Sequence, residues 1–297
     1  MKRTIVILIV VLALLALALL GVMIAGIVNG GLNLGRVWPG SAGLVNTQTL
    51  SLEGVDTLSV DYISESVRFY AGNDDEVVVK EYMNRDEQEL FARITREGGT
   101  LRIEHGRRSG ILFLNSRVEI YLPESYRGAL SVRSVSGSLR LEEDLQLERL
   151  EVNTVSGSIR LQSVTAPEIQ AASTSGSLKA GYLAGRANLH TVSGSIKVEG
   201  GRGGGVYAST SGSIRLRVDG EPGDIDASSR SGSVHISIPP GQSFSFQAKT
   251  TSGGIHTSFA EQLSELRDRA ASGVIGSSPT FALRASSTSG SIHVDEE

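Results

Sequence analysis

The sequence predicts an all-β protein: a single-stranded parallel β-helix, or solenoid, of about 18–21-residue Ser-Gly-Ser coils, preceded by one N-terminal transmembrane helix. The first observation behind this prediction is a Ser-Gly-Ser phrase, once Ser-Gly-Gly, that recurs eight times. Its central glycines are separated by 20, 19, 18, 18, 20, 21 and 37 residues, and a fixed period near 20 is typical of stacked repeats. These glycines, expected to be structural turn residues, are Gly137, Gly157, Gly176, Gly194, Gly212, Gly232, Gly253 and Gly290.

The second observation is the alternation of apolar residues around each glycine. Aliphatic residues mostly stand two and four positions after the glycine and five and seven before it, which is the pattern of strands with one buried face. We therefore expect each coil to contain two short strands joined at the glycine, where the missing Cβ permits a bend. Because so small a unit cannot bury its apolar face alone, successive coils must stack.

The first 46 residues are expected to tether the domain to a membrane. Residues 1–3 form a basic cytoplasmic N-terminus, residues 4–28 a transmembrane anchor and residues 29–46 a Gly-rich spacer. The uncharged run of residues 4–28 gives a helix of about 37 Å, longer than the roughly 30 Å hydrocarbon core. A cleaved signal peptide is the alternative, but its apolar region would be only about 7–15 residues. The basic N-terminus predicts a single-pass protein of the cell membrane with an extracytoplasmic C-terminal domain.

Residues 47–297 are expected to form one β-solenoid domain in two parts. Residues 47–125 contain strand-like runs without the strict repeat, and they are assigned to irregular first coils and a cap, because the exposed end of a solenoid needs atypical capping turns. Within them, Glu65 stands where a turn glycine would stand. Residues 126–297 carry the regular repeats.

Two departures from the repeat are expected near the C-terminus. Leu263 and Leu266 lie three residues apart among charged residues, which predicts a short helical insertion near residues 259–271. Residues 273–276 are expected to form the turn of a degenerate coil that fills the gap of 37 residues.

The repeated phrase resembles that of a known family. The pattern Thr/Ser-Val/Thr-Ser-Gly-Ser-Ile-Arg-Leu, with Tyr121-Leu122-Pro123 and Ile238-Pro239-Pro240 before long coils, is similar to the adhesin-like domain of unknown function in bacterial surface proteins. The resemblance extends over roughly residues 50–297 and includes LiaG-like membrane-anchored members of envelope-stress operons. It implies an envelope β-solenoid and offers no catalytic residue to carry over.

Composition and motifs argue against several functions. The formal net charge of −4 shows no basic excess for nucleic acid, and the absence of cysteine excludes disulfides and thiolate-bound metals. Nucleophilic catalysis requires one serine with a base and an orienting partner, whereas this serine recurs in register as a turn element. The acidic runs at residues 74–76 and 142–144 are expected in turns, and the Gly-rich residues 200–205 in a tight inter-strand loop. We expect no enzyme activity and no cofactor; a glycan-acting β-helix enzyme is the alternative.

Basic side chains recur at one outward position, three residues after each glycine. We expect them to stack at about 4.8 Å per coil into a basic column. Since like charges directly opposite on paired strands are unfavourable, the column indicates an anionic partner; a solvated polar face is the alternative. The basic column consists of Arg140, Arg160, Lys179, Lys197, Arg215, His235, His256 and His293. A metal site between His235 and His256 in adjacent coils is a further alternative, but a strand column suits tetrahedral metal geometry poorly, and no metal is predicted.

These features predict a non-enzymatic, adhesin-like binding module of the cell surface. Its expected partners are the membrane, through the single-pass anchor, and either an anionic envelope polymer, contacted through the basic column, or a membrane or envelope protein. An accessory or scaffold protein of an envelope-stress signalling system is the alternative. The sequence leaves the oligomeric state open.

Overall fold

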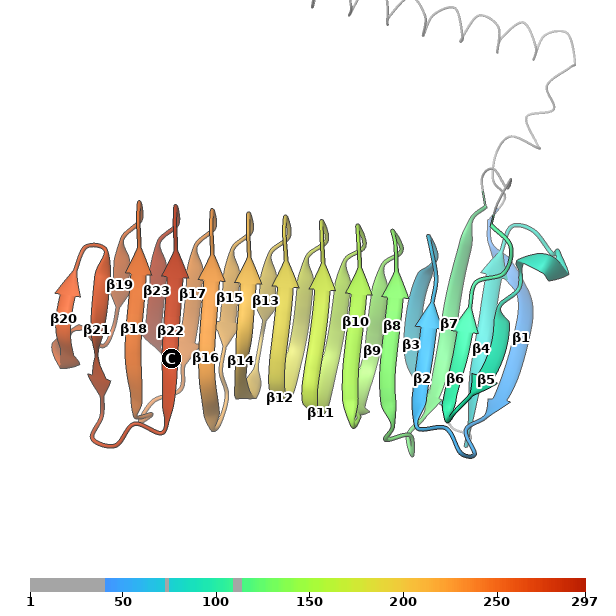
Figure 1. The fold of residues 1–297 in the computed structure, drawn as a ribbon, viewed down its shortest axis with the longest axis horizontal. Helices are drawn as coiled ribbons and strands as arrows, with labels where there is room; N and C mark the ends of the chain where they lie inside the picture. Colours follow the sequence, from blue (N-terminus) through green and yellow to red (C-terminus); the bar gives the residue numbers. More distant parts are fainter. Residues whose placement is uncertain (1–40, 73–74, 109–113) are drawn as a thin grey trace, which may run out of the picture.

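The computed structural model describes residues 41–72, 75–108 and 114–297. These residues form 23 strands in one continuous hydrogen-bonded sheet, mostly parallel, that winds into stacked coils (Figure 1). The all-β, solenoid-like fold predicted from the repeat is confirmed. The predicted anchor at residues 4–28 lies outside the described residues, and none of the helical segments that are described is long and apolar enough to cross a membrane.

Each regular coil contributes one strand to a front sheet, before its Ser-Gly-Ser turn, and one to a back sheet, after it (Figure 1). Coils stack so that each residue lies opposite the equivalent residue of the neighbouring coils. Leu150, for example, lies between Leu130 and Ile169. The front strands are β8 (Ala129–Ser134), β10 (Arg149–Thr154), β14 (Gly201–Ser209) and β16 (Pro222–Ser229). The back strands are β9 (Leu139–Gln146), β13 (Ile196–Val198), β15 (Ile214–Arg217) and β17 (Val234–Ile238), while β11 (Ile159–Ser173) and β12 (Leu178–Thr191) belong to both sheets.

The core lies between the two sheets and is continuous from end to end. In β8, for example, Leu130 and Val132 are buried whereas Arg133 is exposed, as strand alternation requires. Burying one aliphatic side chain contributes about 1.5–3 kcal/mol, and each coil buries only a few of them. Stability therefore depends on the contact between neighbouring coils.

The Ser-Gly-Ser turns line up along one side of the solenoid, which we call the turn edge. None of the eight turn glycines has a positive φ, so the bend itself does not require glycine, contrary to the expectation. The requirement comes from the neighbouring coil: a Cβ added at Gly176 would lie 1.8 Å from the carbonyl oxygen of Gly157. Glycine is needed because turns of adjacent coils approach too closely for any side chain.

A buried hydroxyl three residues before each glycine ties the turns together. Ser173 Oγ accepts a hydrogen bond from the Gly176 N–H (2.8 Å) and donates one to the Gly157 carbonyl oxygen (3.1 Å). The same pair of bonds recurs at Thr191, Ser209, Ser229, Thr250 and Ser287. Because an unpaired buried hydroxyl or amide is costly, this ladder explains why the position is always Ser or Thr.

The N-terminal end departs from chain order. The first coil, β2 (Thr57–Asp61) and β3 (Ser66–Gly72), lies between β8 and β9 on one side and β6 (Thr100–Glu104) and β7 (Ser116–Pro123) on the other. Glu65 joins β2 to β3, which confirms that it occupies the place of a turn glycine. Antiparallel strands β1 (Gly43–Ser51), β4 (Glu76–Met83) and β5 (Arg93–Glu97), with the 3-10 turn η1 (Gln88–Leu90), close this end.

The core and the start of the cap can be compared with the predicted segments. Buried side chains of residues 47–125, predicted to form an irregular cap, belong to the same core as those of the regular coils. The predicted spacer of residues 29–46 extends too far, because β1 begins at Gly43 and residues 43–46 already belong to the cap.

The C-terminal end shows the same departure from chain order. β22 (Phe281–Ser287) lies between β16 and β18 (Phe244–Thr250), and β23 (Ile292–Glu296) lies between β17 and β19 (Ile255–Thr257) (Figure 1). The last coil in the sequence, β22 and β23, is thus inserted between the two coils that precede it in the sequence. The hairpin β20 (Leu263–Arg267) and β21 (Ala270–Ile275) closes the end, with β21 antiparallel to β18.

The helical insertion predicted near residues 259–271 is wrong. Only the 3-10 turn η2 (Ala260–Gln262) is helical there, and the charged segment after it forms β20. The degenerate coil expected at residues 273–276 is also wrong, because this stretch ends the antiparallel strand β21. The open edge of β18 offers backbone donors and acceptors, which a hairpin satisfies and a helix cannot.

Candidate anion-binding surface

The structure places the predicted basic column in one row on the back sheet. Neighbouring strands bring Arg140 opposite Arg160, and the pairing continues in register through Arg215 to the histidines. The order of the row is Arg140, Arg160, Lys179, Lys197, Arg215, His235, His293, His256. All eight predicted residues therefore lie on one face, with His293 and His256 in exchanged order because the last coil is inserted.

Arg68 extends the basic column by one coil at its N-terminal end. It lies directly opposite Arg140 and, on its other side, opposite Glu119. Sequence reasoning missed it, although it stands three residues after Glu65, as the other members stand three residues after their glycines. Glu119 forms an ion pair with Arg117 (3.1 Å), so an acidic side chain lies beside the N-terminal end of the column.

Acidic neighbours neutralise only part of the column. Glu142 lies 3.8 Å from Arg140, and Glu199 lies 2.6 Å from Lys197. Within the described ranges no carboxylate lies within 4 Å of the three exposed cations Arg160, Lys179 and Arg215. The hydrogen bond from Lys197, with the charges of Lys179 and Arg160, holds the pKa of Glu199 below its ordinary value. This carboxylate therefore interacts electrostatically with three neighbouring cations of the column.

Two shallow hollows lie over the central section of the basic column. One, of about 320 Å³, lies among the hydroxyls of Ser138, Ser158 and Ser177 and the cations Arg140, Arg160 and Lys179. The other, of about 290 Å³, is lined by Arg160, Lys179, Lys197 and Glu199. Serine hydroxyls and cations spaced by one coil can donate hydrogen bonds to phosphate, sulfate or carboxylate oxygens.

The three histidines stack at the C-terminal end of the column. The rings of His256 and His293 have centroids 4.8 Å apart and lie almost parallel, and His235 follows at 5.9 Å from His293. Burial, then the charges of His256 and His235, lowers the pKa of His293. His293 lies between the two residues of the alternative metal site, which are therefore not in adjacent coils, and in the described chain no three His, Cys, Asp or Glu side chains are grouped to hold a metal.

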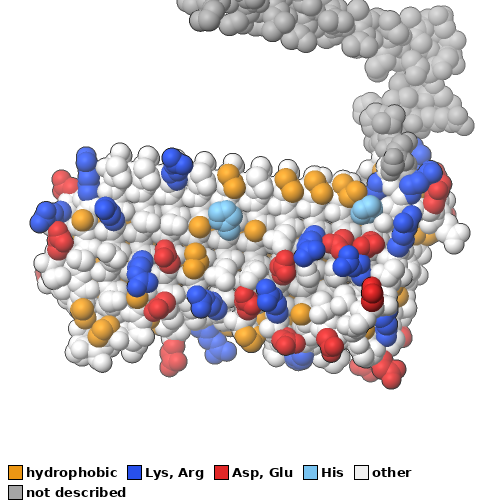
Figure 2. Space-filling view, in the orientation of Figure 1, with side chains coloured by type: hydrophobic (Ala, Val, Ile, Leu, Met, Phe, Trp, Pro, Cys, Tyr) orange, Lys and Arg blue, Asp and Glu red, His pale blue; other side chains and the backbone are white. Residues whose placement is uncertain are grey.

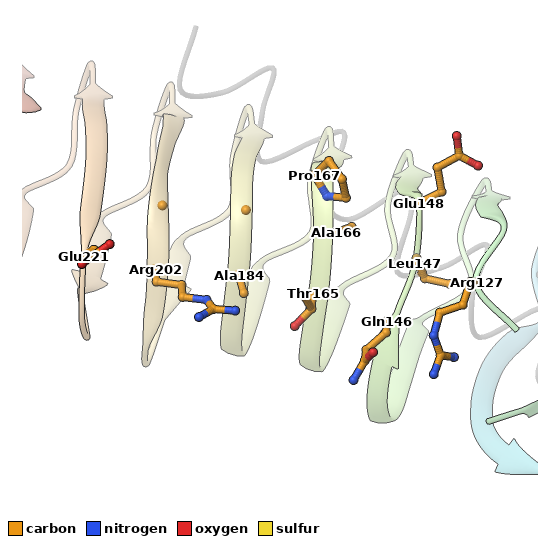
Figure 3. Close-up of a pocket in the computed structure, with 12 residues that line it drawn as sticks. Arg127, Gln146, Leu147, Glu148, Thr165, Ala166, Pro167, Ala184, Arg202 and Glu221 are labelled. Carbon is orange, nitrogen blue, oxygen red and sulfur yellow. The ribbon is translucent and has the colours of Figure 1, made fainter. Parts of the chain in front are cut away.

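A larger hollow, of about 750 Å³, lies along the edge opposite the turn edge (Figure 3). Its lining includes Leu147, Ala166, Gly185 and Gly203 from successive coils. Arg127, Arg202, Glu148 and Glu221 give it both signs of charge, so it lacks the uniform sign of the basic column. The Gly-rich residues 200–205, predicted to be a tight loop, instead run into strand β14 from Gly201.

Sequence reasoning also missed a buried ionic cluster in the N-terminal cap. Glu65 and Glu81 are both fully buried. Burial would raise the pKa of Glu65, but its ion pair with Arg108 outweighs this and lowers it. Burial raises the pKa of Glu81, which accepts hydrogen bonds from the Ala92 N–H and the Asn46 amide. The sequence signal for this cluster was Glu81, an acid at the position where the alternation of Val77 and Val79 predicts a buried side chain.

No curated protein matches the chain, whereas several solved structures are similar to it. A protein described as a putative adhesin from Bacteroides fragilis is 15% identical, with a TM-score of 0.48, over 85% of this chain and 96% of its own. Two proteins of Parabacteroides distasonis are similar. One, described as a putative lipid binding protein, is 16% identical with a TM-score of 0.46 over 84% and 96% of the two chains. The other, a putative adhesin, is 14% identical with a TM-score of 0.45 over 85% and 96%.

Residues 55–295 match the family described as Toastrack DUF4097. The match begins just before β2 and ends within β23, so it includes all the coils of the solenoid and the hairpins at its ends. By this match, the chain belongs to the Toastrack DUF4097 family.

Proposed function

We propose that this chain is a non-enzymatic, membrane-anchored surface-binding module that contacts an anionic polymer of the cell envelope through its basic column. The observation that carries the proposal is a run of cations on adjacent strands, three of which, Arg160, Lys179 and Arg215, are exposed and lack a carboxylate within 4 Å in the part of the chain that the structure describes.

The energetics of the column support a binding role. Like charges directly opposite on paired strands destabilise a sheet, and here five cations follow one another at the strand spacing of about 4.8 Å. A polar position on a solvated face could hold serine or threonine instead. The front sheet shows the contrast, because Lys and Arg are mixed with Asp and Glu over its surface (Figure 2).

The shape of the surface favours an extended ligand over a small molecule. The two hollows on the column are shallow and follow each other along the solenoid axis. A polymer with repeated anionic groups can contact several cations at once, and linked weak contacts raise the overall affinity well above that of one contact. Phosphodiester polymers have this chemistry.

The location of the module rests on the sequence of residues 4–28. This stretch is uncharged and long enough to span a bilayer as a helix, and Lys2 and Arg3 favour a cytoplasmic N-terminus. The solenoid would then lie outside the cytoplasm, where envelope polymers are present.

The test measures binding of the full-length chain, in a neutral detergent, to immobilised polyglycerol phosphate. The column variant changes Arg140, Arg160, Lys179, Lys197 and Arg215 to Gln. A matched control changes five exposed front-sheet cations, Arg133, Arg149, Arg186, Lys249 and Arg284, to Gln, so both variants lose the same charge. We expect at least a tenfold loss of affinity for the column variant and little loss for the control. Equal losses, or none, would refute the proposal.

A further inference from the structure

An exposed aliphatic row runs along the N-terminal half of the turn edge. The residues two positions before the turn glycine, or before Glu65, project outward from consecutive coils. They are Ile63, Val135, Val155, Thr174 and Val192, and the four aliphatic ones are 38%, 49%, 48% and 38% exposed in that order. Backbone bonds from the Val135 N–H to the Ile63 carbonyl (3.1 Å) and from the Val155 N–H to the Val135 carbonyl (3.2 Å) hold these turns at strand spacing.

The fold does not require aliphatic residues at this position. Other coils carry Thr210, Arg230, Thr251 and Thr288 there. Their turns keep the backbone bond from the serine before the glycine to the carbonyl two residues before the neighbouring glycine. Half-exposed valines therefore contribute little to the core. Their placement in one row indicates a contact made by the edge itself.

The turn edge also lacks exposed acids. From three residues before to one residue after each turn glycine, the coils contain one acid, Glu65, which is fully buried, and one base, Arg230. The whole chain has 32 acidic residues, so they are concentrated on other surfaces. Figure 2 shows this edge along the top of the molecule, with hydrophobic side chains spaced along it.

The chemistry changes in layers from the turn edge towards the back sheet. Along the chain the aliphatic row comes first, exposed serines follow one residue before the glycine, further serines stand one residue after it, and the basic column lies two residues further along. This order matches the layers of a bilayer surface, where acyl chains, polar headgroup atoms and phosphates succeed one another.

The N-terminal segment attaches at this same edge. β1 begins at Gly43, which pairs with Met83, and Met83 pairs with Ser116 at the end of β7 that lies beside the first turn. The predicted anchor ends at residue 28. The 14 residues from 29 to 42 can extend at most about 50 Å, so an anchored chain keeps the turn edge within reach of the lipid.

We propose that the turn edge rests on the outer surface of the membrane, with the aliphatic row at the boundary between headgroups and acyl chains. This inference rests on the anchoring in the proposed function. The basic column then lies at headgroup level, so the test changes only the aliphatic residues and uses lipids without net charge.

The absence of cysteine permits single-site labelling of the full-length chain. Ser175, exposed in the middle of the row, is changed to Cys and labelled with a small fluorophore; Gln146→Cys on the opposite edge is the control. Each protein is reconstituted into phosphatidylcholine vesicles with and without a brominated lipid that quenches fluorescence on contact. We expect quenching at residue 175 to exceed that at residue 146 at least twofold. Changing Val135, Val155 and Val192 to Thr, the residue of other coils, should remove this difference.

Equal quenching at the two sites would overturn the inference, as would quenching at residue 175 that persists in the three-threonine variant. A label shielded from water but unaffected by brominated lipid would indicate a second copy of the chain on this edge, and would also overturn it. Extraction of the vesicles with sodium carbonate reports the anchor separately. If the chain is extracted, the anchoring and the inference both fail; if it is retained without edge-specific quenching, only the inference fails.

Discussion

The six coils from Gly137 to Gly232 stack in chain order, whereas the coils at both ends do not. In the middle, each coil lies on the one before it and repeats its register. At each end, one coil is inserted between its neighbours and antiparallel strands close the stack. The middle follows a local rule that any coil satisfies, whereas the ends depend on contacts specific to them. The predictions below separate these two kinds of stability.

The largest effect is expected in the middle, at Gly194. A Cβ there would lie 2.0 Å from the carbonyl oxygen of Gly176, and backbone on both sides prevents relief. We expect Gly194→Ala to lower the free energy of unfolding by at least about 4 kcal/mol, measured by urea denaturation. The matched control is Gly43→Ala in the cap, where nothing lies within 4 Å; an equal loss there would contradict the role of coil contact.

The next effect is expected in the N-terminal cap, at Arg108. Arg108→Met removes the ion pair of Glu65 and leaves a buried carboxylate uncompensated. Breaking such a pair costs about 3 kcal/mol or more, so the cap should unfold at lower denaturant concentration. Arg107→Met is the control, because its pair with Glu89 is exposed on both sides and contributes less than about 1 kcal/mol. Similar losses in the two variants would show that the buried cluster does not stabilise the cap.

A smaller, pH-dependent effect is expected at the C-terminal end. His293 faces His235 on β17 and His256 on β19, with Asp295 on its own strand. Because the folded pKa of His293 is lowered, the unfolded chain binds its proton more readily. Its contribution to stability is complete above the unfolded pKa of about 6.5 and declines as the pH falls towards the folded value.

The melting temperature of the parent should therefore fall more between pH 7.5 and 5.5 than that of His293→Asn. His105 and His190 are present in both proteins and cancel in the comparison. Identical pH profiles would mean that the histidine stack imposes no cost when it is protonated.

The comparison also shows which parts of the structure the sequence can reveal. Strand alternation and the turn phrase predicted the middle coils, and with them the register of the basic column. They could not reveal the inserted coils. Leu283 lies between Ile225 and Phe246, but Phe246 could have followed Ile225 directly in the apolar row equally well. Every coil presents the same pattern, so the period alone does not determine the order of stacking.

The strand arrangement of the two caps could not be predicted for a different reason. Apolar alternation marks a strand but not the direction of its partner, so β4 and the β20–β21 hairpin could not be recognised as antiparallel. The spacing of Leu263 and Leu266 suited a helix as well as a strand, and the need to close the edge of β18 decided between them. Arg68 could have been predicted as a member of the basic column, because it stands three residues after Glu65, which takes the place of a turn glycine.

The smallest effect on stability is expected from the basic column itself. Changing its five Lys and Arg residues to Gln removes repulsion between neighbours, so the free energy of unfolding should stay the same or rise by about 0.5 kcal/mol. A loss of several kcal/mol, measured by the same urea denaturation, would make the column structural. The charges would then need no ligand.

The salt dependence of polymer binding tests the role of the column most directly. Exposed charges are screened within about 10 Å at 0.1 M salt, so affinity of the full-length chain for polyglycerol phosphate should fall steadily as salt rises. The account predicts that this dependence weakens stepwise as Arg160, then Lys179, then Arg215 is changed to Gln, and is unchanged in the front-sheet control. A dependence that persists through the three column changes but weakens in the front-sheet control would contradict it.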